Sequence, residues 1–169
     1  MVAGERANYN GAITRTTATD AFTAVPTTAA PMAIRACDGS GVAITPTRTA
    51  GGALDMTGVG VITYTTGGLT LPVFMECSAI SITSARVGST LTLGASNNLY
   101  RCNIANTHAS SVSAIGVNAS NGAYLLECDI ACASSNASSN GMTSTQTLAS
   151  RCLFTNSGGG AAIQANNRS

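Results

Sequence analysis

The side chains of this chain that could do chemistry are seven carboxylates, eight arginines, six cysteines and a single histidine, His108. The carboxylates are Glu5, Asp20, Asp38, Asp55, Glu76, Glu127 and Asp129. Two carboxylates held a few ångströms apart can hydrolyse a glycosidic bond, one as the acid and the other as the base or nucleophile. Any glycosidase mechanism therefore requires the fold to bring two of these acids together on one face.

The cysteines and the histidine show no metal-binding pattern. The cysteines are Cys37, Cys77, Cys102, Cys128, Cys132 and Cys152. No C-x-x-C pair occurs, and one histidine cannot complete a local zinc set. His108 lies in a polar stretch typical of a solvated turn, and Cys132 has no basic neighbour that would activate its thiol. We therefore expect no metal, no cofactor and no enzymatic activity.

The charge content excludes several partners. Charged side chains make up 9% of the 169 residues, against about 25% in an ordinary soluble domain. Every basic residue is an arginine and the formal net charge is only +1, so we expect no binding of nucleic acid or of anionic membranes. No apolar run has the length of a membrane span, and the first residues do not resemble a secretory signal. These features predict a soluble protein that is made in the cytoplasm.

A short motif recurs four times along the C-terminal part of the chain, at steps of 25, 26 and 24 residues. It consists of a charged residue, a cysteine, any residue and an apolar residue. Between 11 and 14 residues after each cysteine comes a second strand-like segment, and turn-forming Asn, Ser and Gly lie between the two. Helical periodicity is absent. Each repeat is therefore predicted to be one coil of a right-handed parallel β-solenoid, in an all-β protein.

Stacked coils place equivalent residues above one another, so the four motif copies predict two columns of side chains. One column would point inward as free, buried thiols: Cys77, Cys102, Cys128 and Cys152. The other would point outward with charges of alternating sign: Glu76, Arg101, Glu127 and Arg151. Since Arg101 would stand between Glu76 and Glu127, we expect an ion-pair ladder here, not a catalytic carboxylate pair.

The N-terminal part of the chain does not show the repeat. Residues 1–40 are rich in Thr and Ala, contain Pro26 and Pro31, and are expected to form an extended arm. Residues 41–72 are expected to form a cap or a degenerate first coil. The coils themselves would fill residues 73–169. Four coils with a core of small residues are near the lower limit of a stable stack, which favours oligomerisation.

The four copies of the motif, in coils of about 25 residues, resemble the parallel β-helix repeats of bacteriophage virion proteins. The resemblance covers about residues 73–169. Such repeats occur in tailspikes, in head fibres and in trimeric capsid decoration proteins, which are also called cement proteins. The small size of the chain favours the decoration protein, because a tailspike normally has many more coils and acidic catalytic residues.

The resemblance implies a non-enzymatic viral structural protein on the capsid surface of a virion. It would form a homotrimer and clamp neighbouring copies of the major capsid protein. The N-terminal arm would make inter-subunit contacts through five polar side chains: Arg6, Asn8, Tyr9, Asn10 and Arg15. Many modest interfaces, repeated over the shell, would then resist the internal pressure of the packaged DNA.

Three other functions are compatible with a β-solenoid. A fragment of a tailspike or fibre would bind or cleave a glycan. An ice-binding protein would need an unbroken array of Thr-x-Thr, but the coil between Thr90–Thr92 and Thr143–Thr145 has Ala114–Gly116 at the matching place. An adhesin from another source would be expected to carry an export signal.

Overall fold

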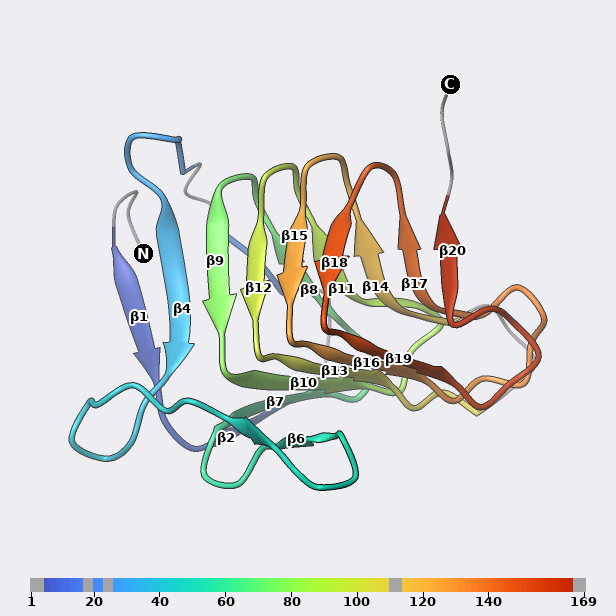
Figure 1. Ribbon diagram of the computed structural model, residues 1–169, viewed down its shortest axis with the longest axis horizontal. Coiled ribbons are helices and arrows are strands. Elements are labelled where there is room, and N and C mark those ends of the chain that lie inside the picture. The colour runs from blue at the N-terminus through green and yellow to red at the C-terminus, as the bar shows by residue number, and fades with distance from the viewer. Residues whose placement is uncertain (1–4, 17–19, 23–25, 110–113, 166–169) are drawn as a thin grey trace.

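The computed structural model of the chain describes residues 5–16, 20–22, 26–109 and 114–165. Three parallel sheets of six strands run along a stack of six coils, and each coil gives one strand to each sheet (Figure 1). No helix occurs among the described residues. The structure confirms the predicted all-β class and the parallel solenoid of roughly 25 residues per coil.

Each coil visits the three sheets in the same order, and we name them sheets A, B and C. Sheet A consists of β1 (Arg6–Tyr9), β4 (Met32–Ala36), β9 (Met75–Ser78), β12 (Asn98–Tyr100), β15 (Tyr124–Leu126) and β18 (Leu148–Ser150). Sheet B consists of β2 (Ala12–Arg15), β7 (Gly60–Tyr64), β10 (Ile80–Ser84), β13 (Asn103–Asn106), β16 (Asp129–Cys132) and β19 (Leu153–Asn156). Sheet C consists of β3 (Asp20–Ala21), β8 (Leu69–Leu71), β11 (Gly88–Leu93), β14 (Ala114–Ala119), β17 (Asn140–Ser144) and β20 (Ile163–Ala165).

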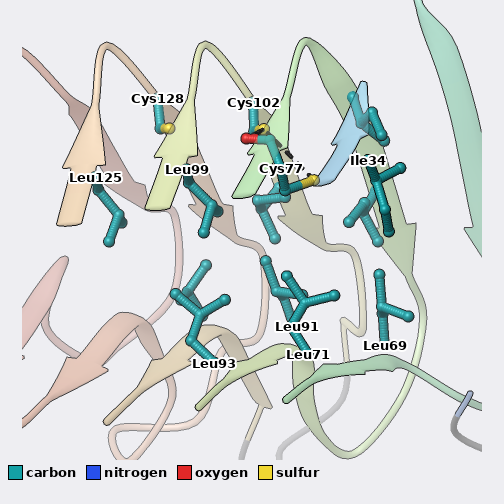
Figure 2. Packing of buried hydrophobic residues seen from close by; sticks show 14 of the residues in the cluster. Ile34, Leu69, Leu71, Cys77, Leu91, Leu93, Leu99, Cys102, Leu125 and Cys128 are labelled. Atoms are coloured by element: carbon teal, nitrogen blue, oxygen red, sulfur yellow. Dashed lines mark hydrogen bonds between the residues drawn. The ribbon is translucent and has the colours of Figure 1, made fainter. Parts of the chain in front are cut away.

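The core lies between the three sheets and is filled by columns of apolar side chains. Because side chains alternate along a strand and the strands pair in register, each inward residue meets its equivalent in the next coil. Sheet B contributes Ile62, Ile82, Ile104, Ile130 and Phe154. Sheet A contributes Ile34, Cys77, Leu99 and Leu125 (Figure 2). Sheet C contributes Leu69, Leu91, Val117 and Met142.

Polar side chains stabilise the corner between sheets B and C. Asn106 Nδ2 donates to Gly88 O at 2.9 Å and to Ile115 O at 3.3 Å. Two coils further on, Asn156 Nδ2 donates to Ser139 O at 2.7 Å. The loops at this corner cannot pair all their carbonyl groups within a sheet, and an amide side chain supplies the missing donor.

The structure differs from the prediction at the N-terminus, where the expected extended arm forms the first coil of the stack. β1 pairs in parallel with β4, β2 with β7 and β3 with β8. A terminal coil is covered by a neighbour on one side only, and all four residues of β2 are exposed. The alternation that identifies a strand in a sequence is therefore missing from β2.

The solenoid also begins well before the predicted boundary at residue 73. Of the two alternatives expected for residues 41–72, a cap or a degenerate first coil, residues 60–71 follow the second in part: β7 and β8 belong to a coil, which is the second of the stack. Between β4 and β7 the chain leaves the stack over residues 37–59, which we call the strap. The strap contains the antiparallel pair β5 (Thr47–Arg48) and β6 (Leu54–Asp55) and lies below the first strands of sheet A in the view of Figure 1.

Replacing Ile104 by Ala is expected to lower the free energy of unfolding by about 2–5 kcal/mol, because it leaves a cavity in the middle of the sheet B column. Urea unfolding followed by circular dichroism measures the loss. Thr83→Ala is the matched control on the outer face of the same sheet, and should cost less than about 1 kcal/mol. Equal losses in the two variants would contradict the assigned inward and outward faces.

Candidate functional site

Three of the four charged residues of the sequence motif lie at the corner between sheets A and B, not on a strand. Arg101, Glu127 and Arg151 occupy equivalent places in three successive coils, and we call them the charge column. Their φ angles are 49°, 56° and 53°, in the left-handed region that residues other than glycine seldom adopt. Contacts to the surrounding structure must hold such a backbone in place.

Glu127 is the centre of the charge column and pairs with the arginines on both sides. Arg101 Nε lies 2.5 Å from Glu127 Oε2, and Arg151 Nη2 pairs with Glu127 Oε1. The Glu127 side chain is only 10% exposed, and the two pairs offset the cost of removing its charge from water. The hydrogen bond from Arg101, with the nearby arginine charges, lowers the pKa of the Glu127 carboxyl. Glu127 is thus an ionised structural group.

The cysteine column differs from the prediction at its first member. Three cysteines stack at the corner in successive coils: Cys102, Cys128 and Cys152. Cys77 lies instead on β9, level with Leu99. In the third and fourth coils, Ile82 pairs with Ile104, so equivalent residues are 22 positions apart in the sequence. The prediction had paired Cys77 with Cys102, which are 25 positions apart. The Sγ atoms of Cys77 and Cys102 still lie 4.0 Å apart (Figure 2).

Glu76 shifts together with Cys77 and does not belong to the charge column. Ala79 takes the equivalent corner place in the third coil. Glu76 is exposed on the outer face of sheet A, level with Asn98. Glu76 and Glu127 therefore lie in different columns, and the two-carboxylate arrangement considered from the sequence does not form.

All six cysteines are free thiols, and only Cys152 is less than fully buried. Hydrogen bonding to a neighbouring thiol, together with burial, raises the pKa of both Cys128 and Cys152. A thiol that stays protonated at neutral pH is a poor nucleophile and metal ligand. The Cys132 thiol is buried and bonds to Ala114 O at 3.4 Å. These cysteines therefore act as small core residues.

The strap bonds to the corner that carries the charge column. Arg101 Nη1 donates to Pro46 O at 2.9 Å. From β5, Arg48 Nη1 pairs with Asp129 Oδ1 at 2.8 Å, and Arg48 Nη2 donates to Arg151 O, also at 2.8 Å. Groups of the fourth, fifth and sixth coils are thus bonded to a segment inserted in the second coil.

The outward side chains of sheet A form two rows along the stack, which we call the sheet A face. The first row is Arg6, Ala33, Glu76, Asn98, Tyr124 and Leu148. The second row is Asn8, Arg35, Ser78, Tyr100, Leu126 and Ser150. The face therefore changes from charged at its N-terminal end to aromatic and apolar at its C-terminal end. The outer row of sheet C, by contrast, is polar throughout: Thr70, Thr92, Asn118, Thr143 and Gln164.

Three shallow hollows meet at Glu76 on the charged end of this face. They have volumes of about 370, 390 and 200 Å³. Residues 28–31 line the first two, and residues 43–46 of the strap line the third. The other side chains around them are chiefly Arg6, Arg35, Asn98 and Tyr100. The sheet is thus the floor of a trough between two walls.

The five residues predicted to anchor a free arm all lie in the first coil or at its corner: Arg6, Asn8, Tyr9, Asn10 and Arg15. Asn8 Oδ1 accepts a hydrogen bond from Arg35 Nε at 2.7 Å. The Tyr9 hydroxyl donates to Val61 O at 3.5 Å. These side chains therefore bond to the second coil, and Arg6 and Asn8 belong to the sheet A face.

The remaining candidates from the sequence form no cluster. His108 is half-buried next to Asn106, whose Oδ1 accepts a hydrogen bond from the His108 backbone at 3.0 Å. Within the residues that the structure describes, no three His, Cys, Asp or Glu side chains are placed to hold a metal ion. The same part of the chain contains no helix of the length and apolar character needed to span a membrane.

The sequence did not single out Arg35, Arg48, Asn98, Tyr100 or Tyr124. Asn98 and Tyr100 flank the inward Leu99, so the alternation along this strand was a signal that both point outward. Arg48 had no such signal, because its partners lie 81 and 103 residues away along the chain.

Comparison of the chain with protein-family models, with curated proteins and with solved structures finds no match. The sheet A face, the charge column and the strap are therefore the features on which a function must rest.

Acid should destabilise the protein partly through Glu127. Its pKa is lower in the fold than in the unfolded chain, where it titrates near 4.5, so its contribution is complete above that pH and is lost as the pH falls towards the folded pKa. The melting temperature of the wild type should therefore drop more steeply between about pH 5 and 3 than that of Glu127→Gln. Parallel curves for the wild type and Glu127→Gln would contradict the assignment.

The thiols should resist alkylation in the folded protein. We expect iodoacetamide at pH 7 to label Cys152 slowly and Cys102 not at all, because Cys102 is fully buried while Cys152 is partly accessible. In concentrated urea all six cysteines should react. Mass spectrometry of peptides follows each site, and rapid labelling of native Cys102 would show that the column is not packed as described.

Proposed function

We propose that this protein is a non-enzymatic structural protein that docks onto other proteins through the sheet A face. The observation that carries the proposal is the apolar end of this face, where Tyr100 lies beside Leu126 and Tyr124 beside Leu148. Only 4% of the residues are aromatic, and two of the four tyrosines stand here. Leu148 is 64% exposed. An exposed apolar patch beside polar side chains is typical of protein interfaces.

In its specific form, the proposal is a capsid decoration protein on the surface of a virion. The apolar end of the face would join three copies of the chain, since contacts between identical subunits are the more apolar kind. The charged end, with Arg6, Arg35 and Glu76, would bind the major capsid protein. The resemblance of the coils to bacteriophage β-helix repeats supports this form. Because the expected arm is the first coil, docking would use a rigid surface.

The bonding of the acids supports a role without catalysis. Glu127 is held by two arginines. Both carboxylate oxygens of Asp129 accept hydrogen bonds, from Arg48 and from the backbone N–H of Leu54. The Glu127 carboxylate, whose pKa is lowered by the hydrogen bond from Arg101, is a poor source of the proton that glycoside cleavage requires.

Binding of a glycan without cleavage is a second candidate function, and the hollows at Glu76 favour it. Carboxylate, guanidinium and amide groups bind hydroxyls, and Glu76, Arg35 and Asn98 offer one of each. The ring of Tyr100 supplies a flat apolar surface beside the third hollow. Three adjoining hollows suit a ligand of several sugar rings.

The oligomeric state tests the main proposal. Light scattering after size-exclusion chromatography should give the wild type three times the mass of one chain. Leu148→Asp should give monomers, because a buried charge without a partner opposes the contact. Thr143→Asp is the matched control on the outer face of sheet C and should stay trimeric. A monomeric wild type at micromolar concentration would rule out the trimer.

Saturation-transfer NMR with chitohexaose and maltohexaose separates the two candidates. Saturation transfer to a sugar that occurs with the wild type and is lost in Glu76→Gln would establish the glycan site, provided that light scattering gives the variant the same oligomer mass as the wild type. We expect no transfer to either sugar if the face serves only protein contacts. Transfer that survives in Glu76→Gln would place the sugar elsewhere on the molecule.

A further inference from the structure

The strap is a long insertion at a corner that the other coils turn in one or two residues. β9 and β10 are separated by Ala79 alone, whereas residues 37–59 separate β4 from β7. The strap then bonds to corners of the fourth, fifth and sixth coils (Figure 1). The strap therefore connects three coils along their outer surface. The same coils are also joined by backbone hydrogen bonds between their strands.

One carboxylate holds both strands of the strap. Asp129 Oδ1 accepts from Arg48 Nη1 of β5 at 2.8 Å, and Asp129 Oδ2 accepts from Leu54 N of β6 at 2.6 Å. The Asp129 side chain is 13% exposed, so water competes weakly for these bonds. Asp129 itself is fixed at the start of β16, level with Asn103 and Leu153.

Two further bonds join the strap to the coils, and both end on backbone carbonyl groups. Arg48 Nη2 donates to Arg151 O at 2.8 Å. Arg101 Nη1 donates to Pro46 O at 2.9 Å. The four bonds all involve an ionised side chain, which makes this part of the attachment polar and directional. Apolar packing adds to it, because Ile44 and Met56 also pack against the core.

The turns of the strap are held by the strap's own residues. Asp38 Oδ1 accepts from the backbone N–H groups of Ser40 and Val42 at 2.9 Å. Asp55 Oδ1 accepts from the hydroxyl and the backbone N–H of Thr57. Within the stack, β16 remains paired with β13 and β19 whatever the strap does. The strap and the coils can thus separate without breaking a ladder of the solenoid.

We propose that the strap is a clamp that opens as a unit, with the Asp129 carboxylate as its latch. When the latch is closed, the strap lies over the Arg101 and Glu127 part of the charge column and forms the wall of the hollow beside Tyr100 with residues 43–46. Opening exposes Arg101 and Glu127 further and removes that wall. The clamp therefore controls the shape of one end of the trough on the sheet A face, whatever partner this face binds.

Hydrogen exchange of the full chain, followed by mass spectrometry, tests the latch. In Asp129→Ala we expect the peptides of residues 44–56 to exchange at least about tenfold faster, because hydrogen bonds to a charged group are lost. Peptides of β13, β16 and β19 should keep the rate of the wild type. The amide of Leu54 is the most direct reporter, since it donates to Asp129.

Asp55→Asn is the matched control, because Asp55 is an acid of the strap that bonds only within it, to Thr57. Its strap peptides should exchange at the rate of the wild type. Unchanged exchange in Asp129→Ala would overturn the proposal. So would equal acceleration of β16 and β19, because the strap would then not be a separate unit.

Salt supplies a second test that needs no variant. At 1 M salt the Debye length falls to about 3 Å, and a latch made of an ion pair should weaken. Strap peptides of the wild type should then exchange several-fold faster, while those of Asp129→Ala should hardly respond. The same response in both proteins would show that the attachment does not depend on the Asp129 charge.

Discussion

The structure depends on one constraint, which is that every coil must pair in register with the coil before it. Parallel pairing places each side chain beside the equivalent side chains of the coils before and after it. A residue must therefore be compatible in size and charge with both of these neighbours. Ile82, Ile104 and Ile130 meet this condition inside sheet B. The charge column meets it at the corner by alternating sign, since like charges one coil apart would repel each other.

The scarcity of charge gives each charged group a defined place. Glu127 and Asp129 lie close together at one corner, and the first joins coils while the second holds the strap. Glu76 differs, because it stands exposed where three hollows meet. Structural charges are thus gathered under the strap, and charges available to a partner lie at the N-terminal end of the sheet A face. The binding role proposed above rests on this division.

Predictions from the sequence succeeded where the pattern repeats. They failed in the terminal coil, which has a neighbouring coil on one side only, and at a residue type that suits two positions of the coil. Cysteine is small and apolar enough for either the corner column or the strand column, so Cys77 was aligned with Cys102 although it pairs with Leu99. β2 belongs to a terminal coil and is exposed throughout, so its strand was not recognised. The tyrosines of the sheet A face were visible in the sequence, but their adjacency followed only from the register.

The sequence by itself determined the class of structure, because alternation and turn residues act over a few positions. Strand, corner and the period of about 25 residues are local properties of that kind. Only the tertiary structure decided the number of coils, the register of the third coil and the place where the strap binds the stack. The contacts from Arg48 to Asp129 and Arg151 span 81 and 103 residues. No local pattern encodes such contacts, since they arise only when the stacked coils bring the two segments together.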